Sequence, residues 1–298
     1  MKVTAACLPC MTHRAYREVC YATDDPALRL KVMVEVAKLL GEEFRPDSVP
    51  AIVGTKRDRL IKALTGNPDP YKAVKEFSNR AALELLPWAE ERIKSEGGSY
   101  ERFRKACMFA VVGNAMEFDI LGHRFSVEDL AGLLAEAEER LAIDDIEDIY
   151  EVVKEKRRVL YLTDNAGEIA FDALLVRELR AMGAYVTVAV KSEPCINDAL
   201  MEDALAVGMD KIANELITTG TDTVGLVLEW ASPQCLKAYQ EAGLVIAKGM
   251  GNIETLTEYE HDKPIAFFLY TKCETIANHL GVERGKCVVK LLRPGEEI

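Results

Sequence analysis

Two oxygen-bearing side chains stand side by side at the end of an apolar run near the middle of the chain. Asp164 and Asn165 directly follow the run, and Asp198 comes soon after the next apolar run. Carboxylate and amide oxygens suit hard divalent cations such as Mg²⁺ and Mn²⁺. If the two runs are neighbouring strands, the sequence therefore predicts a cation site formed by Asp164, Asn165 and Asp198.

Positive charge and small residues also follow the ends of apolar runs. Lys191 follows one run and Lys248 another, and Gly249 and Gly251 come directly after Lys248. Glycine lets backbone N–H groups approach an anion closely, and two lysines beside a cation would provide the positive charge that a phosphate group needs. Taken singly, Asp164 could be only a helix cap and each lysine only a solvated side chain. Their shared position at strand ends is what favours a phosphate site.

The elements that would position these residues are short apolar runs that alternate with helical patterns from Arg157 onward. This rhythm is typical of βαβ units and a parallel sheet. In such a sheet, ligands bind outside the carboxyl ends of the strands. The polar residues that follow the runs should therefore meet at one edge. The runs are 158–163, 185–190, 216–219, 244–247, 264–270 and 287–292.

The first half of the chain has a different pattern. Residues 12 to 156 show successive helical patterns, and Asp25 followed by Pro26 is a strong helix start. We find no convincing strand in this half. We therefore expect an α/β protein, with an all-helical N-terminal region in residues 1–143 and a Rossmann-like, mainly parallel sheet in residues 144–298.

Composition excludes several partners. Forty-nine acidic against thirty-seven basic residues give a net charge of −12, which repels nucleic acid. No apolar stretch reaches the ~18 residues that a membrane span requires, and the N-terminus does not resemble a secretory signal. We expect a cytoplasmic protein with no nucleic-acid or membrane partner, in which the eight cysteines stay as thiols or in part bind metal.

Some enzyme classes lack their sequence signatures here. There is no Gly-x-Ser-x-Gly elbow of a serine hydrolase, and the turn after residue 163 is not the Gly-x-Gly-x-x-Gly of dinucleotide enzymes. Cys7 and Cys10 form one C-x-x-C pair, whereas a structural zinc usually takes four ligands. These two cysteines are therefore either structural thiols or part of a metal or redox site. We expect Cys195 to be a packed thiol.

Three ordered motifs resemble those of the damage-control phosphatase family, also known as domain of unknown function 89. They are DNAGEIAFD (164–172), the segment from Lys191 to Ala199, and KGMGNIE (248–254). The Cys7-Leu8-Pro9-Cys10 opening is similar to the microbial branch of that family. The resemblance covers nearly the whole chain. It implies a helical region packed on a Rossmann-like domain and a divalent-metal-dependent phosphatase acting on phosphorylated metabolites, including sugar phosphates.

The resemblance also implies roles for single residues. Asp164, Asn165 and Asp198 resemble ligands of Mn²⁺, Mg²⁺, Co²⁺ or Ni²⁺, and Lys248 resembles a phosphate-binding lysine; we expect these four to be catalytic. A segment of the helical half would close over the substrate. The further substrate-binding residues expected from the motifs and the strand ends are Asn114, Asp119, Lys191, Thr219, Gly249, Gly251, Asn252 and Glu254.

Two other functions fit a Rossmann-like sheet. A carboxyl methyltransferase would bind S-adenosylmethionine at the same edge, but it would need an acidic residue after the second strand, where this chain has Lys191. A non-enzymatic protein could hold a phosphorylated metabolite without turning it over. The leading prediction is a metal-dependent phosphomonoester hydrolase with a role in metabolite damage control.

Overall fold

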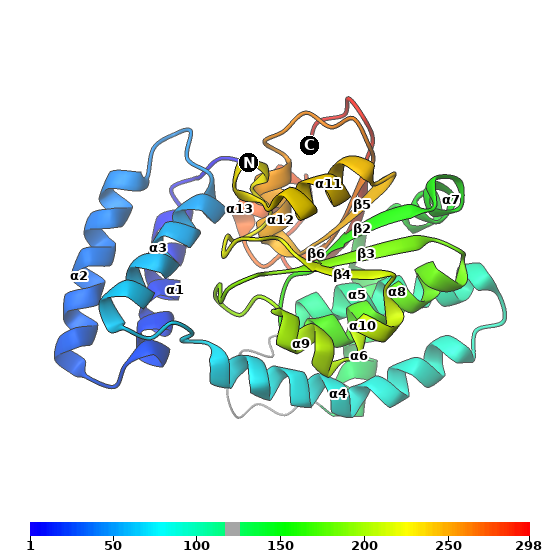
Figure 1. The fold of residues 1–298 in the computed structure, drawn as a ribbon, viewed down its shortest axis with the longest axis horizontal. Coiled ribbons are helices and arrows are strands. Elements are labelled where there is room, and N and C mark those ends of the chain that lie inside the picture. Colours follow the sequence, from blue (N-terminus) through cyan, green and yellow to red (C-terminus); the bar gives the residue numbers. More distant parts are fainter. Residues whose placement is uncertain (117–125) are drawn as a thin grey trace.

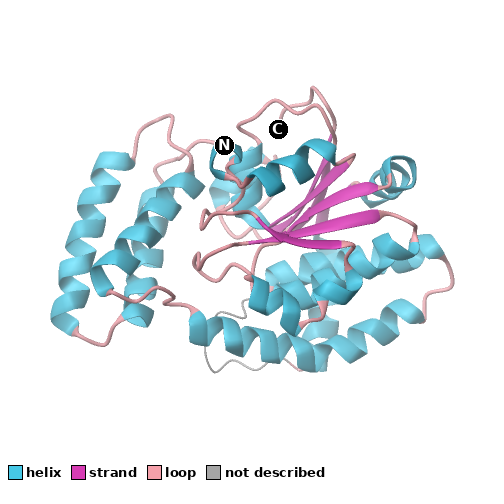
Figure 2. Cartoon of the chain, in the orientation of Figure 1, coloured by secondary structure: helices cyan, strands magenta, loops and turns pink. Residues whose placement is uncertain are grey.

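The structure, a computed structural model, describes residues 1–116 and 126–298. Three helices, α1 to α3, stand beside a sheet that is covered by helices on both faces (Figure 1). In Figure 2 the magenta strands lie between two layers of cyan helices, and α1 to α3 lie apart from both layers. This arrangement confirms the α/β fold class with N-terminal helices and a mainly parallel sheet.

The first three helices pack on one another. Helix α2 begins where the sequence predicts, because Asp25 Oδ1 accepts a hydrogen bond from the N–H of Ala27 at 2.9 Å and Pro26 lies in the first turn. Helix α3 ends at Gly66, whose φ of +70° is easy only for glycine. The three helices share an apolar cluster that is separate from the cores against the sheet. Their bounds are α1 Cys7–Ala22, α2 Pro26–Glu43 and α3 Pro50–Thr65.

The next helices cover one face of the sheet. Helix α5 is buried from Ala106 to Asn114, and it packs against α8 in the largest apolar cluster of the molecule. None of the helices in residues 1–116 and 126–298 combines the length and apolar character needed to cross a membrane. The bounds on this face are α4 Lys72–Lys94, α5 Ser99–Ala115, α6 Val127–Arg140, α7 Ile146–Lys156, α8 Glu168–Ala181, α9 Met201–Ala206 and α10 Met209–Ile212.

The described strands form one sheet in the order β1-β7-β6-β5-β2-β3-β4. Every neighbouring pair is parallel except β6 and β7. Each apolar run predicted from residue 158 onward is a strand, with ends that differ by at most one residue. The bounds are β1 Leu141–Asp144, β2 Arg158–Leu162, β3 Tyr185–Val190, β4 Glu215–Thr218, β5 Leu244–Lys248, β6 Ile265–Tyr270 and β7 Cys287–Leu292.

Two features of the sheet differ from the prediction. Strand β1 was missed in the half that showed no strand, because its four residues lie between two acidic helices and pair only with the edge partner β7. Strand β7 is antiparallel to β6 because only α13, Glu274–His279, and a turn join the two strands. The chain therefore enters β7 at the end where it left β6, and no crossover returns it to the other end.

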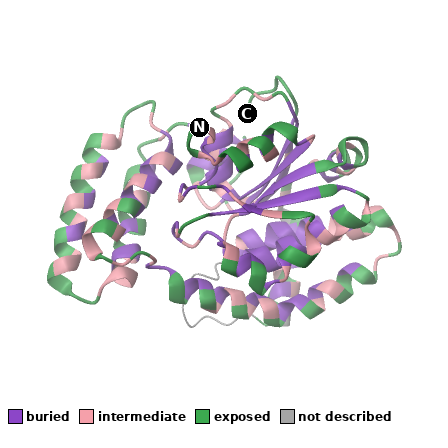
Figure 3. Cartoon of the chain, viewed as in Figure 1, coloured by how far each residue is buried: buried purple, intermediate pink, exposed green. Residues whose placement is uncertain are grey.

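The strands are buried on both faces. Val159 and Tyr161 point into the cluster shared with α5 and α8, whereas Leu160 and Leu162 point into a second cluster on the opposite face. Figure 3 shows the buried strands in purple between the helical layers. The helices on the second face are α13 together with the 3-10 helix η1 Leu228–Trp230, α11 Pro233–Glu241 and α12 Gly249–Leu256.

The strand order reverses at β2, which has β3 on one side and β5 on the other. The chain continues from β3 outward to β4, and from β5 outward to β6 in the other direction. Open α/β sheets bind ligands at such a switch point, outside the carboxyl ends of the strands. We call the carboxyl ends of β2, β3, β5 and β6, with the loops that follow them, the C-terminal rim.

Candidate functional site

A cavity of about 220 Å³ lies between the C-terminal rim and the helices α1 and α3. Each of these helices lines the cavity with residues three or four positions apart, so one face of each helix forms the far wall. Charged side chains occur on both walls. The described ones on which the argument below depends are Arg14, Arg17 and Arg57 on the helical wall, Asp164 and Asp198 on the rim, and Glu254 on α12.

Asp164 is half-buried where β2 ends, beside the first residue of α12. Gly249 has a φ of +75°, and a Cβ atom built on it would lie 1.9 Å from Oδ2 of Asp164. Only glycine therefore leaves room for the carboxylate in this place. The N-terminus of an α-helix carries a partial positive charge, which favours an acidic group beside it.

Asp198 reaches the same cavity from the loop after β3. The N–H of Ala199 donates to the backbone oxygen of Asp164 at 2.8 Å, and Asn165 and Asp198 form an isolated antiparallel bridge. Lys191 lies 3.6 Å from Oδ2 of Asp198, and its Nζ donates to a backbone oxygen of the loop after β4 at 2.5 Å. The structure thus brings together the two carboxylates that the sequence places after separate strands.

Two amide side chains hold the carboxylates in place. Nδ2 of Asn114, on α5, donates to Asp164 Oδ2 and to Glu168 Oε2, both at 2.9 Å. Nδ2 of Asn165 donates to the same two oxygens at 2.8 and 3.0 Å. The amide oxygen of Asn114 accepts the N–H of Tyr270 at the end of β6 at 3.0 Å. One wall of the cavity is therefore a connected network spanning α5, β2, α8 and β6.

Lys248 lies deeper in the core than this network and is completely buried. Its Nζ donates to the backbone oxygen of Ala110 at 3.0 Å and to Asp172 Oδ1 at 2.6 Å, and it also contacts Glu168. Tyr161 donates its hydroxyl hydrogen to the same Asp172 oxygen at 2.7 Å. A lysine ammonium has three hydrogens, and here three protein oxygens accept them. The two carboxylates raise the pKa of Lys248 although its burial lowers it, so the ammonium stays charged.

The two carboxylates on the rim have raised pKa values. Burial raises the pKa of Asp198 to about 8; Lys191 opposes this increase and the charge of Asp164 adds to it. Burial also raises the pKa of Asp164 to about 6, and the charge of Glu168 adds to that increase, against the opposing effect of nearby lysines. Each carboxylate is thus destabilised by burial and by a like charge, and a bound cation would relieve both effects.

The chemistry of this donor set fits a hard divalent cation. Asp164 and Asp198 offer carboxylate oxygens, and Asn165 uses its amide nitrogen within the protein, which leaves its amide oxygen as the atom that could bind a cation. Within residues 1–116 and 126–298, no group of three or more His, Cys, Asp and Glu side chains could hold a metal ion. A cation here would therefore need the amide and oxygens from water or a ligand.

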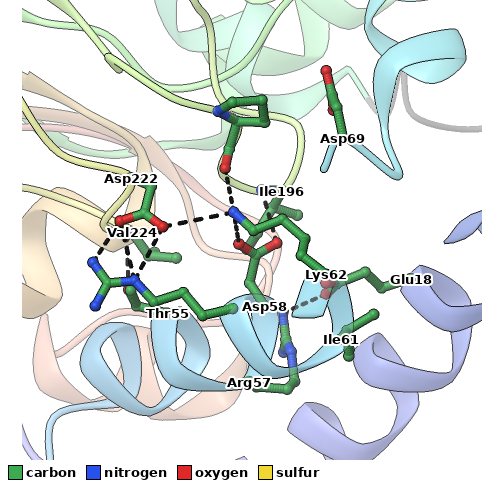
Figure 4. Close-up of polar contacts among 12 residues, drawn as sticks. Glu18, Thr55, Arg57, Asp58, Ile61, Lys62, Asp69, Ile196, Asp222 and Val224 are labelled. Atoms are coloured by element: carbon green, nitrogen blue, oxygen red, sulfur yellow. Dashed lines mark hydrogen bonds and ion pairs between the residues drawn. The ribbon is translucent and has the colours of Figure 1, made fainter. Parts of the chain in front are cut away.

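The loop that carries Asp198 is held by helix α3 (Figure 4). Ile196 has a φ of +48°, which is a strained value for a β-branched residue. Its N–H donates to Oδ1 of the buried Asp58 at 3.3 Å, and Lys62 donates to the backbone oxygen of Pro194 at 2.5 Å. Lys62 also pairs with Asp58 at 2.7 Å. These contacts hold the strained turn two residues before Asp198.

The same helix also contacts the loop after β4. Arg59 Nε donates to both carboxylate oxygens of Asp222 at 3.1 and 3.0 Å, and Thr55 Oγ1 accepts the N–H of Val224 at 3.0 Å. Gly251 on α12 packs against this loop so closely that a Cβ atom would lie 2.8 Å from the side chain of Val224. Helix α3 therefore fixes two neighbouring loops of the rim.

The predicted site residues separate into three groups. Among the described residues, Asn114, Asp164, Asn165, Asp198, Gly251 and Glu254 line the cavity. Five others do not line it and lie in its supporting structure: Lys191, Thr219, Lys248, Gly249 and Asn252. Asp119 lies outside the described residues. Asn252 has a clear supporting role, because its amide donates to the backbone oxygen of Lys248 at 2.7 Å.

Sequence reasoning missed several charged residues of the site. Glu168 lies within the first motif, and Lys272 is one of the polar residues at the end of the run that forms β6, but neither was assigned a role in the site. The three arginines of the helical wall had no such signal, because nothing in a helical pattern shows which face meets the sheet. Glu254 was predicted, and burial raises its pKa to about 7 while Arg14 opposes that increase.

The cysteines have separate environments. Cys7 and Cys10 both line the cavity, together with Cys273 at the start of α13, and all three are free thiols. Cys195 is buried, and burial raises its thiol pKa well above the ordinary value. Cys195 is therefore the packed, unreactive thiol that the sequence predicted.

Comparison with known proteins assigns the class. The family model described as the damage-control phosphatase ARMT1-like domain matches residues 3–288. The chain belongs to this family.

Individual relatives agree with this assignment over nearly their full lengths. A protein of Archaeoglobus fulgidus named damage-control phosphatase is 37% identical over 293 residues, which cover 98% of this chain and 100% of the relative. A damage-control phosphatase of Pyrococcus horikoshii is 36% identical over 290 residues, 97% of each chain. The crystal structure of a DUF89 family protein from P. horikoshii superposes with a TM-score of 0.88 at 34% identity and covers 99% of both chains.

Proposed function

We propose that this protein is a phosphatase that hydrolyses phosphate monoesters of small metabolites with the help of a divalent cation. Family membership and the names of its relatives support the phosphatase class. The observation that carries the cation is the meeting of Asp164 and Asp198 in one cavity at the switch point of the sheet. Phosphoryl transfer depends on compensation of negative charge more than on a covalent intermediate. A cation bound at this site would supply that compensation.

The cation would be held by Asp164, Asn165 and Asp198. When bound, a divalent cation polarises phosphoryl oxygens and makes a water molecule easier to deprotonate. Lys272, which lines the cavity from the end of β6, would add positive charge at the phosphoryl group. Lys191 would hold the loop of Asp198 through the contacts described above.

Other residues would orient these groups. Asn114 and Asn165 fix the Asp164 carboxylate, and the buried Lys248 fixes Glu168, which accepts from both amides. Glu254 lines the cavity and has a pKa of about 7, so it could give a proton to the departing alkoxide and regain it near neutral pH. A cation site together with a carboxyl group whose pKa is near neutral pH suits the hydrolysis of alkyl phosphates.

A screen of phosphorylated metabolites would test the proposal. The purified protein should release phosphate from members of the panel with Mn²⁺, Mg²⁺, Co²⁺ or Ni²⁺ and lose this activity in chelator. Asp198→Asn should weaken metal affinity measured by calorimetry, and excess metal should partly restore turnover. Full activity in a metal-free preparation would rule out the cation, and no phosphate release from any compound with any metal would rule out the phosphatase.

The role of Lys248 in contacting the phosphoryl group stays a prediction: Lys248 does not line the cavity and protein oxygens accept its three hydrogens, so such a contact would require Nζ to leave one of these partners. Lys248→Ala should lower turnover by ~10²-fold or more, on the scale of one lost electrostatic donor, and excess metal should not restore it. The variant should also lose about 3–5 kcal/mol of stability, because Glu168 and Asp172 would be left buried without their partner. Assays must therefore run well below its measured melting temperature. If the variant loses metal binding while Asp198→Asn keeps it, the roles assigned to the two residues are wrong.

A further inference from the structure

Three arginines gather on the helical wall of the cavity, opposite the carboxylates of the rim. Arg14 and Arg17 lie one turn apart on α1, and Arg57 comes from the adjacent face of α3. Arg14 is exposed, Arg17 is half-buried and Arg57 is only 1% exposed. The arginine cluster, as we call these three residues, therefore extends from the solvent side of the cavity into its interior.

One buried tyrosine lies in the cavity wall near the cluster. Tyr71 also lines the cavity, and all three arginines act electrostatically on its hydroxyl group, which places them near a common point. Burial is the main cause of the raised pKa of this tyrosine, and the arginines oppose it. A neutral hydroxyl group near the arginines can donate a hydrogen bond to an anion that the guanidinium groups attract.

The most deeply buried arginine of the cluster, Arg57, is only partly satisfied by the described residues around it. Arg57 contacts the buried Glu18 at 3.3 Å (Figure 4), and its Nε has no hydrogen-bond partner within the described residues. Burial raises the pKa of Glu18 to about 8, against the effect of Arg57. A buried guanidinium nitrogen without a partner is costly, and an acceptor from a ligand would remove that cost.

The two walls of the cavity thus have opposite character. The rim presents Asp164 and Asp198, and the helical wall presents the arginine cluster, in a protein with a net charge of −12. Glu254, on α12, lies close enough to Arg14 for the arginine to oppose the rise in its pKa. If a cation at the rim binds the phosphoryl group, the arginines lie across the cavity from it. They would then face the other end of the substrate. A volume of about 220 Å³ suits a compact molecule, because drug-sized ligands occupy cavities of ~300 Å³ or more.

We propose that the arginine cluster binds a second anionic group of the substrate, so that the preferred substrates are small phosphate monoesters with a carboxylate or a second phosphate at the far end. This inference rests on the proposed phosphatase function, because that function places the reacting phosphate at the rim. Guanidinium groups bind carboxylate and phosphate through paired hydrogen bonds, so the cluster suits either group.

Three substrates with one carbon skeleton separate the possibilities. Sorbitol 6-phosphate has a neutral far end, 6-phosphogluconate has a carboxylate there, and sorbitol 1,6-bisphosphate has a second phosphate. The wild-type protein should show a higher kcat/KM for at least one of the two doubly anionic compounds than for sorbitol 6-phosphate. The better of the two then identifies the preferred group. Equal or lower values for both would overturn the proposal.

Variants of the arginine cluster provide a second test of the proposal. Arg14→Gln and Arg17→Gln should each lower kcat/KM for the preferred doubly anionic compound by about 10- to 100-fold, as expected for a lost hydrogen bond between charged groups. For sorbitol 6-phosphate the change caused by Arg17→Gln should stay within about threefold. Because Arg14 also acts on the pKa of Glu254, Arg14→Gln is judged by the ratio of kcat/KM between the doubly anionic compound and sorbitol 6-phosphate. Arg80→Gln, an exposed arginine of α4 outside the cavity lining, is the matched control and should leave both values unchanged.

The outcomes distinguish this inference from the proposed function. Equal losses for all three compounds would mean that the arginines bind the reacting phosphate, and no loss for any would mean that they bind no part of the substrate; either result overturns the inference. If the wild-type protein hydrolyses nothing, the phosphatase proposal fails. Calorimetric titration of 6-phosphogluconate and sorbitol 6-phosphate into wild-type and Arg17→Gln protein then tests the cluster, which must still favour the doubly anionic compound.

Discussion

Gly249→Ala would displace the Asp164 carboxylate without changing any charged group. The added Cβ atom would lie 1.9 Å from Asp164 Oδ2, whereas an ordinary contact is about 3.5 Å, so the carboxylate must move by roughly 1.5 Å. A misplacement of about 1 Å at a reacting centre can cost ~10²-fold in rate. We therefore expect turnover to fall by ~10²-fold or more and metal affinity to fall with it. The φ of +75° would add about 1–2 kcal/mol of instability.

Gly208→Ala provides the control for backbone strain. Gly208 has a φ of +71°, and a Cβ atom on it would meet nothing within 4 Å. This variant should lose a similar 1–2 kcal/mol in thermal or urea unfolding and keep its turnover within about twofold. Kinetics with a generic phosphomonoester, beside calorimetric metal titration, would compare the two proteins. If Gly249→Ala retains as much turnover as Gly208→Ala, the carboxylate of Asp164 does not act where we place it.

Three further predictions concern other groups of the site. Glu254→Gln should lower turnover of alkyl phosphates by ~10²-fold or more but affect p-nitrophenyl phosphate little, because a good leaving group needs no proton; equal losses would argue against proton transfer. The raised pKa of Glu18, about 8 against an ordinary 4.5, contributes stability that is complete below pH 4.5 and is lost as pH rises to 8. The free energy of unfolding of Glu18→Gln, measured in urea, should therefore rise relative to that of the wild-type protein between pH 4.5 and pH 8, by at most ~1.4 kcal/mol per pH unit. A difference between the two proteins that does not change with pH would contradict this. Replacing Cys7 and Cys10 together by serine should lower the melting temperature, because Cys7 is buried against neighbouring threonines, and should leave turnover within about threefold. Loss of turnover in a double variant that is as stable as the wild-type protein would show that the thiols take part in the reaction.

The alternation of apolar runs and helical patterns was enough to predict the sheet and the C-terminal rim that lines the cavity. Asp164 and Asp198 follow β2 and β3, and the pairing of these strands fixes their proximity, so sequence reasoning could locate them. It could not show which positive groups face the cavity. Lys248 is the last residue of β5, but its long side chain turns back into the core toward α5 and α8. The depth to which a side chain reaches depends on the packing of other elements, which strand periodicity does not record.

The arginines and Asp58 were beyond prediction for a related reason. Their helices contact the rim through tertiary packing between residues more than a hundred positions apart, as for Asp58 and Ile196. A helical pattern in one sequence identifies an apolar stripe, but it does not name the partner of the polar face. Strand β1 was missed because four residues at a sheet edge carry too short a pattern to detect.

The separate apolar cluster of α1 to α3 has a consequence for hydrogen exchange. These helices have their own core, and they meet the rim through ion pairs with Asp222, hydrogen bonds to the loops after β3 and β4, and a small apolar cluster around Tyr71 and Ile196. Their backbone amides should then exchange as one cooperative unit, with an opening free energy below that of the sheet. A ligand in the cavity would touch both units and so slow exchange throughout α2, although α2 itself lines no part of the described cavity. Protection of that outer helix would report occupancy of a site that it does not reach.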